Sequence, residues 1–137
     1  MGKFILLSNF LLIMIGLVSC SNKSANKDLN KDIQNVSSWS ATAYMVGDAW
    51  IHDNVPNKYA QTTLKKAQEE IVKEKENIEK IPTNDKSGIV DNVLRLADKT
   101  EKISTAIAQK NRSEVQKLLS ELAVESQALK QLKTKPE

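Results

Sequence analysis

The sequence predicts an all-α protein, and three of its features carry that prediction. From Leu29 onward, apolar residues recur at steps of three and four, which is the period of an amphipathic helix. No stretch of any length alternates apolar and polar residues as a half-buried strand would. The 137 residues include only 4 glycines and 3 prolines, so turns are few and each element must be long.

The first helix is predicted over residues 28–54. Asp28 is a suitable N-cap, and the helix ends where Asn54 and Val55 precede Pro56, because the residue before a proline avoids the helical region. Its apolar positions are Leu29, Ile33, Val36, Trp39, Ala43, Val46 and Trp50.

The second helix is predicted over residues 56–80, with Pro56 in its first turn. Its apolar stripe is interrupted where Glu74 or Lys75 takes the place of an apolar residue. A Pro-Thr-Asn-Asp segment, residues 82–85, then breaks the chain. The apolar positions are Ala60, Leu64, Ala67, Ile71, Ile78 and Ile81.

The third and fourth helices are predicted over residues 87–109 and 112–133. Between them, Asn111 and Glu114 have the spacing of a capping box, which marks the start of the fourth helix. The apolar positions are Ile89, Val93, Leu96, Ala97, Ile103 and Ile107 in the third helix, and Val115, Leu118, Leu119, Leu122, Leu129 and Leu132 in the fourth.

Four long helices with short connections favour an up-down antiparallel four-helix bundle, about 35 Å long at a rise of 1.5 Å per residue. A helical repeat array is the competing architecture, but the sequence shows no self-similarity at a fixed period. The single cysteine cannot form a disulfide within the chain, so the fold must depend on its apolar core.

The first twenty residues have the composition of an export signal. Lys3 provides a positive charge, and residues 4–18 are apolar apart from Ser8 and Asn9. A helix that crosses a bilayer needs about twenty apolar residues, so this run is short for a membrane span. It matches instead the apolar region of a secretory signal peptide.

Residues 17–20, Leu-Val-Ser-Cys, resemble the lipobox of bacterial lipoproteins, in which apolar and small residues precede a cysteine. The resemblance covers the export segment alone. It implies that a signal peptidase removes residues 1–19 by cutting between Ser19 and Cys20, and that Cys20 carries a diacylglyceryl group on its sulfur. The competing interpretation is an uncleaved anchor helix with Cys20 at its edge.

The same resemblance implies a location. The protein would be anchored by lipid in the cell membrane or the outer membrane, facing the periplasm or the cell exterior. In this family an aspartate after the cysteine commonly retains the protein in the inner membrane, and Ser21 stands there instead. We therefore expect three segments: the cleaved leader over residues 1–19, the lipidated cysteine with a flexible tether over 20–27, and the bundle over 28–137.

Two indoles on the first predicted helix suggest a ligand face. Trp39 and Trp50 are eleven positions apart, which returns them to within about 20° of one another around a helix. Ala43, Val46 and Gly47 lie between them. Two large side chains on either side of three small ones could leave a groove for an apolar ligand. Alternatively, the small residues let a neighbouring helix pack closely while the indoles fill the core.

A second set of residues lies on the exposed flank of the same helix and the turn after it, and we expect it to form an interaction surface. Its members are Tyr44, Asp48, Ile51, His52 and Tyr59. Tyrosine and exposed apolar residues are favoured in recognition surfaces. Asp48 and His52, four positions apart, offer a metal two ligands, whereas structural zinc sites use four, so no metal site is predicted.

The composition gives no support to enzymatic or nucleic-acid-binding classes. His52 is the only imidazole, and the sequence has no nucleophile elbow and no glycine-rich phosphate loop. The formal net charge of +3 is mild and evenly interleaved, unlike that of a nucleic-acid-binding protein. No cofactor is predicted beyond the lipid on Cys20.

The leading hypothesis is therefore a non-enzymatic, lipid-anchored protein of the bacterial cell envelope that binds another envelope protein or cell-wall material. The alternative is a carrier of a small ligand or metal that uses the Trp39/Trp50 face or the Asp48–His52 pair. The sequence leaves the oligomeric state open.

Overall fold

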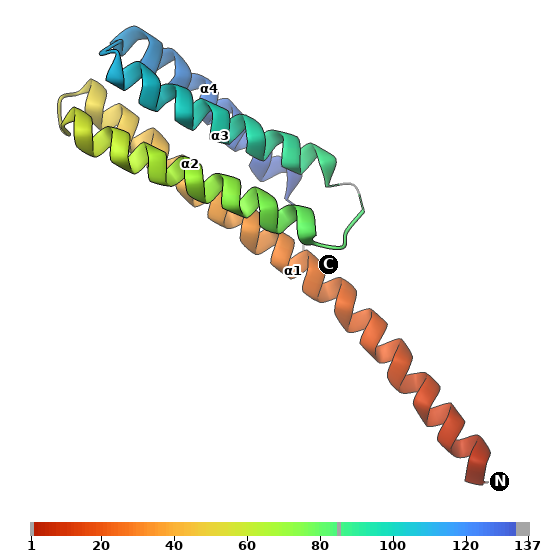
Figure 1. Ribbon diagram of the computed structural model, residues 1–137. Helices are drawn as coiled ribbons and strands as arrows, with labels where there is room; N and C mark the ends of the chain where they lie inside the picture. The colour runs from red at the N-terminus through yellow and green to blue at the C-terminus, as the bar shows by residue number, and fades with distance from the viewer. Residues whose placement is uncertain (1, 85, 134–137) are drawn as a thin grey trace.

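The part of the chain that the structure describes is built from helices and their connections. A computed structural model describes the backbone of residues 2–84 and 86–133, and the side chains of these residues from Ser24 onward. Over this part of the chain there are four helices and no strand (Figure 1): α1 (Gly2–Ile51), α2 (Asn57–Lys80), α3 (Ser87–Ala108) and α4 (Arg112–Leu132). The all-α prediction is confirmed. The side chains of the predicted leader, Ser19 and Cys20 among them, lie outside the described residues.

The helix ends follow from local turns that the sequence analysis located to within a few residues. α1 ends at Ile51 rather than at residue 54, because Asp53 adopts a left-handed conformation with φ of 59°. The Asn54 amide then donates to the Ala49 carbonyl at 2.8 Å, which closes the helix end. Pro56 is the N-cap of α2 in an extended conformation, so α2 begins at Asn57, one position after the predicted start.

At the start of α4, the Asn111 side chain accepts a hydrogen bond from the Glu114 amide at 3.2 Å. This bond is the first half of the predicted capping box. Lys110 before it is left-handed, with φ of 55°, and allows the tight connection from α3.

α1 extends further toward the N-terminus than predicted. Residues 24–27, expected to belong to the flexible tether, are helical, and Asp28 is an interior residue instead of an N-cap. The reason lies in packing, since Ala25 is buried one turn before Leu29 on the same face of the helix.

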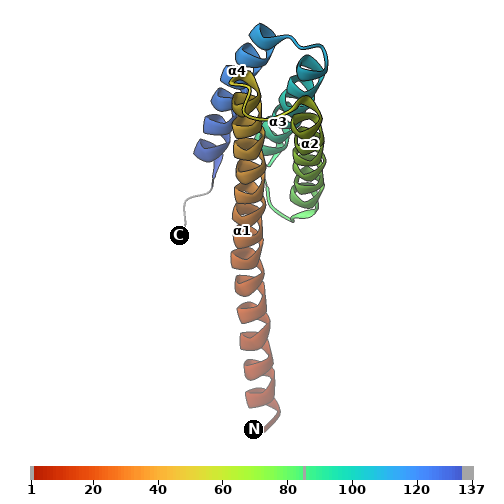
Figure 2. The same cartoon turned by 90° about the vertical axis from the view of Figure 1, so that its left-hand side faces the viewer.

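The helices pack as a bundle around one apolar core. α1 and α3 each contact α2 and α4, while α1 and α3 touch one another only slightly across the middle (Figures 1 and 2). The predicted apolar positions are buried with two exceptions: Trp39 is half-buried against the core, and Leu132 at the end of α4 is exposed. The 3.6-residue period therefore identified the core correctly.

Candidate functional site

The predicted ligand face is part of the core. Ala43, Val46, Gly47 and Trp50 are buried, and Trp50 is only 4% exposed. A Cβ atom added to Gly47 would lie 2.7 Å from Cδ2 of Leu119. Gly47 thus admits a leucine of α4 close to the backbone of α1, which is the packing interpretation of this glycine. Core side chains therefore fill the space beside Gly47, between the two indoles.

Trp50 and Arg112 instead join two turns at one end of the bundle. The Trp50 indole donates from Nε1 to Oδ1 of Asn57 at 2.5 Å. The Arg112 guanidinium lies 5.3 Å from the centre of the Trp50 ring and donates to the Ile51 carbonyl and the Asp53 carboxylate. A polar cavity of about 660 Å³ adjoins this corner. Because the donors of Arg112 bind the chain itself, the contacts fasten the start of α4 to the end of α1.

The structure exposes four of the five residues of the predicted interaction surface. Tyr44, Asp48, His52 and Tyr59 are exposed, whereas Ile51 is partly buried against the core. Nδ1 of His52 donates to the Asp48 carbonyl at 2.8 Å and lies 3.7 Å from the Asp48 carboxylate, so this ring is held along its own helix. Ile51 therefore contributes to the packing of the core more than to the predicted interaction surface.

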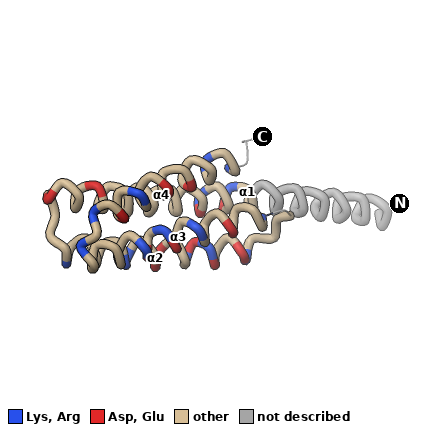
Figure 3. The backbone as a smooth tube through the Cα atoms, turned by 90° about the horizontal axis from the view of Figure 1, so that it is seen from above, with Lys and Arg blue, Asp and Glu red and all other residues tan. Residues whose placement is uncertain are grey.

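Tyr44 belongs to a face of the bundle that carries little charge. Residues 33–47 of α1 form a run of fifteen without a single charged side chain, although 37 of the 137 residues in the sequence are charged (20 basic and 17 acidic). By contrast, eleven of the 24 residues of α2 are charged. Figure 3 shows the same contrast along the tube, with charged residues of both signs dense on α2 and α3.

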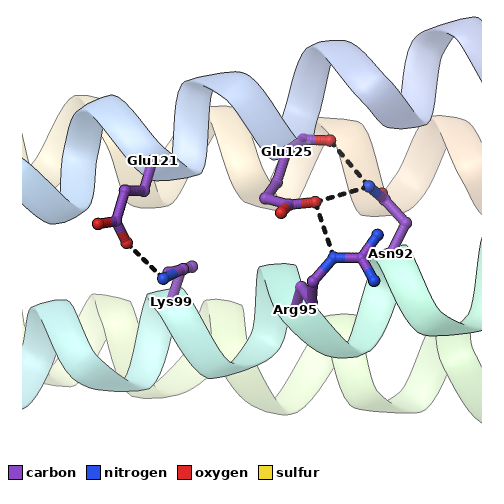
Figure 4. A network of polar contacts seen from close by, with 5 residues as sticks. All are labelled: Asn92, Arg95, Lys99, Glu121 and Glu125. Carbon is purple, nitrogen blue, oxygen red and sulfur yellow. Dashed lines mark hydrogen bonds and ion pairs between the residues drawn. The ribbon is translucent and has the colours of Figure 1, made fainter.

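In its middle, the side of α4 next to α1 is uncharged as well, because the two acidic residues there turn toward α3 (Figure 4). Glu121 pairs with Lys99, and Glu125 accepts from Arg95 at 3.0 Å and from Asn92 at 2.9 Å. The other side of this part of α4 presents Ser120, Ala123, Val124 and Gln127, and Lys130 follows on the same side as Ala123.

We call these two sides, which are uncharged apart from Lys130, together the α1/α4 face. It consists of Ser37, Ser40, Ala41, Tyr44, Met45, Ala123, Val124, Ser126 and Gln127. A groove of about 290 Å³ runs between the two helices, and Lys130 is the one charged residue that lines it. Large apolar side chains protrude beside it: Tyr44 is 41% exposed, and Met45 and Val124 are each 69% exposed.

One polar group in the floor of this groove has no internal partner. Ser40 is 1% exposed and lines the groove, and its Oγ makes no hydrogen bond among the described residues. Buried hydroxyls are normally hydrogen-bonded, so this one is suited to a group that enters the groove. Sequence reasoning named Tyr44 but missed the rest of the face. The signal that would have found it is the charge-free run over residues 33–47.

A second buried polar cluster, between α1 and α2, explains the interruption in the stripe of α2. Glu74 is 8% exposed and accepts from Nδ2 of Asn35 at 3.1 Å and of Asn77 at 3.4 Å. Partial burial, followed by the nearby Glu74 carboxylate, raises the pKa of Asp32 from 3.8 to about 6. Asp28 adds to this increase and Lys31 opposes it.

The raised pKa of Asp32 predicts how the stability of the fold changes with pH. Between about pH 4 and pH 6 the folded chain holds a proton on Asp32 that the unfolded chain releases, so this carboxyl destabilises the fold increasingly as the pH rises. We expect Asp32→Asn to increase the free energy of unfolding by about 1 kcal/mol at pH 7, a value reduced for the solvent exposure of the group. At pH 4 the gain should vanish.

Urea unfolding followed by circular dichroism at both pH values measures this difference. Asp91→Asn on the exposed side of α3 is the matched control, because Asp91 is not buried. An equal gain at pH 4 and pH 7 would show that Asp32 is destabilising for a reason other than its charge.

The described residues contain no group of three or more histidine, cysteine, aspartate or glutamate side chains placed to hold a metal ion. Nor does any helix, over the residues that are described, combine the length and hydropathy required to cross a membrane. Comparison of the chain with protein-family models, curated proteins and solved structures finds no match.

Proposed function

We propose that this chain is a non-enzymatic lipoprotein of the bacterial cell envelope that binds a partner through the α1/α4 face. The observation that carries the binding role is the scarcity of charge on this face, where Lys130 is the only charged residue lining the groove, in a chain otherwise dense with charge. Interface centres are depleted in charged residues and enriched in tyrosine and methionine, as this face is. The exposed Tyr44, Met45 and Val124 supply apolar area for contact.

The anchoring part of the proposal rests on the lipobox-like residues 17–20. Acyl chains on Cys20 would hold the protein at the cell membrane or the outer membrane, with the bundle in the periplasm or at the cell exterior. Each methylene that enters the bilayer contributes about 0.8 kcal/mol, and two or more chains anchor far more durably than one. The partner is then an envelope protein or cell-wall material within reach of the membrane.

We also propose that the bundle has up-down antiparallel topology. Two sets of contacts support it. Arg112 at the start of α4 binds the Ile51 carbonyl at the end of α1. At the opposite end, Leu29 near the start of the packed part of α1 lines one cavity together with Thr83, Ile89 and Leu132.

A photoreactive amino acid at position 44 of the full chain, in membranes of the cells of origin, tests the binding role. We expect light-dependent adducts from position 44, and few from the same probe at position 76 on charged α2. Met45→Ser combined with Val124→Ser should reduce the adducts about tenfold, because both side chains are largely exposed and their loss removes contact area.

Leu94→Ser is the matched control, since Leu94 is an exposed apolar residue of α3, 43% exposed. Circular dichroism establishes that each variant retains its helices. Equal reduction by Leu94→Ser, or equal labelling from positions 44 and 76, would contradict binding through the α1/α4 face.

A further inference from the structure

The α1/α4 face restricts the chemistry of what can cover it. Except opposite Lys130, an occupant needs an uncharged surface, because a charge brought against the rest of this face would lose water without gaining a partner. It needs a protruding apolar side chain to enter the groove of about 290 Å³. It also needs an uncharged hydrogen-bonding group for the buried Ser40 hydroxyl.

The face itself offers all three features. Met45 and Val124 protrude from it, each 69% exposed. Gln127 and Ser126 provide uncharged hydrogen-bonding groups beside the groove. Resting on the proposed function, we infer that the partner at this face is a second copy of the chain, bound in an isologous contact in which each copy fills the groove of the other.

Charges at one end of the face fix the orientation of the two copies. Asp48 lies seven residues after Ala41 on α1, and Lys117 lies seven residues before Val124 on α4, so each continues the same side of its helix. In the antiparallel arrangement proposed above, both lie toward the same end. A two-fold axis parallel to the helices places α1 of one copy over α4 of the other. Asp48 of each copy then faces Lys117 of its partner.

This axis is also the one compatible with the proposed anchor. It keeps the two copies parallel, so that both N-termini and both Cys20 residues point to the same side and reach one membrane. An axis across the helices would send the anchors in opposite directions, and would place Asp48 of one copy against α1 of the other.

The size of the face indicates where the dimer forms. The charge-free run of fifteen residues is about 22 Å long, and two adjacent helices are about 20 Å wide, which gives roughly 450 Å² per copy. Stable interfaces bury about 800 Å² per partner. The contact is therefore weak between free molecules. Confinement in a membrane raises the effective concentration of the second copy and makes the contact persistent.

The test uses the full chain in membranes of the cells of origin, with a tagged and an untagged copy expressed together. A photoreactive amino acid at position 45 of the tagged copy should produce an adduct of twice the monomer mass that contains the untagged copy. Mass spectrometry should map the attachment to residues 120–127. Ala41→Glu in both copies should lower the adduct about tenfold, because Ala41 is exposed in the fold but covered in the dimer. Thr62→Glu, an equal change on α2, should leave it unchanged.

A charge exchange provides the second readout. Asp48→Lys should reduce the adduct, and Lys117→Asp added to it should restore the yield, because the pair is then re-formed with its signs reversed. Adducts with other proteins but none with the second copy would overturn the dimer and leave the proposed function standing. Attachment to peptides of α2 or α3 would also overturn it. No adduct of either kind from positions 44 and 45 would overturn both proposals.

Discussion

Cys20→Ser is expected to abolish covalent lipid on the chain completely. The hydroxyl of serine cannot replace the cysteine sulfur that receives the diacylglyceryl group in the family that residues 17–20 resemble. Because cleavage in that family follows lipid attachment, we expect the variant to keep residues 1–19. The wild-type chain should begin at Cys20 and carry acyl mass.

Intact-mass spectrometry and incorporation of a labelled fatty acid measure both consequences. Simple fractionation is insufficient, because an uncleaved apolar leader also sediments with membranes. Ser19→Ala is the matched control, since it keeps a small residue before the cysteine and should remain lipidated and cleaved. A wild-type chain that begins at Met1 without lipid would establish the uncleaved anchor helix instead, and would remove the reason for placing both copies of the dimer in one membrane.

Trp50→Ala is expected to produce the largest loss of stability among single changes on α1. The side chain is 4% exposed, and truncating a buried tryptophan typically costs about 3–5 kcal/mol. The change also removes the hydrogen bond to Asn57 and the ring beneath Arg112. Two connections between helices are therefore weakened by one substitution.

Urea unfolding of the full chain in mild detergent, followed by circular dichroism, measures the loss. Trp50→Phe should recover most of it, because the ring still packs while only the indole hydrogen bond, worth about 1 kcal/mol, disappears. Trp39→Ala should cost clearly less, since Trp39 is half-buried at the edge of the core. Equal losses at the two tryptophans would mean that they contribute equally to one core, as their shared helical face alone suggests.

The corner around Trp50 and the α1/α4 face have different roles, although both lie on α1. At the corner, every donor of Arg112 named above binds another part of the chain, so the arrangement holds helix ends together. On the face, the Ser40 hydroxyl has no internal partner within the described residues, and large apolar side chains point outward. Of these two regions, the face is the one that contains a buried polar group without a partner, which is the reason for placing recognition there.

The sequence by itself determined the helices and their buried sides. Amphipathic period and helix-end residues act over a few positions, so Asn111 marked the start of α4, and Leu64 and Leu122 were placed in the core without knowledge of any neighbour. It also contained the charge-free run, whose meaning was visible only after α4 was found beside it.

Only the tertiary structure decided how the polar half of each helix is used. Glu121 and Glu125 turn toward α3 because Lys99 and Arg95 lie opposite them, and this leaves the middle of the other side of α4 uncharged. Gly47 is buried because Leu119 occupies the space where its side chain would be. Such outcomes depend on which helix lies at each flank, and a periodic pattern along one helix does not contain that information.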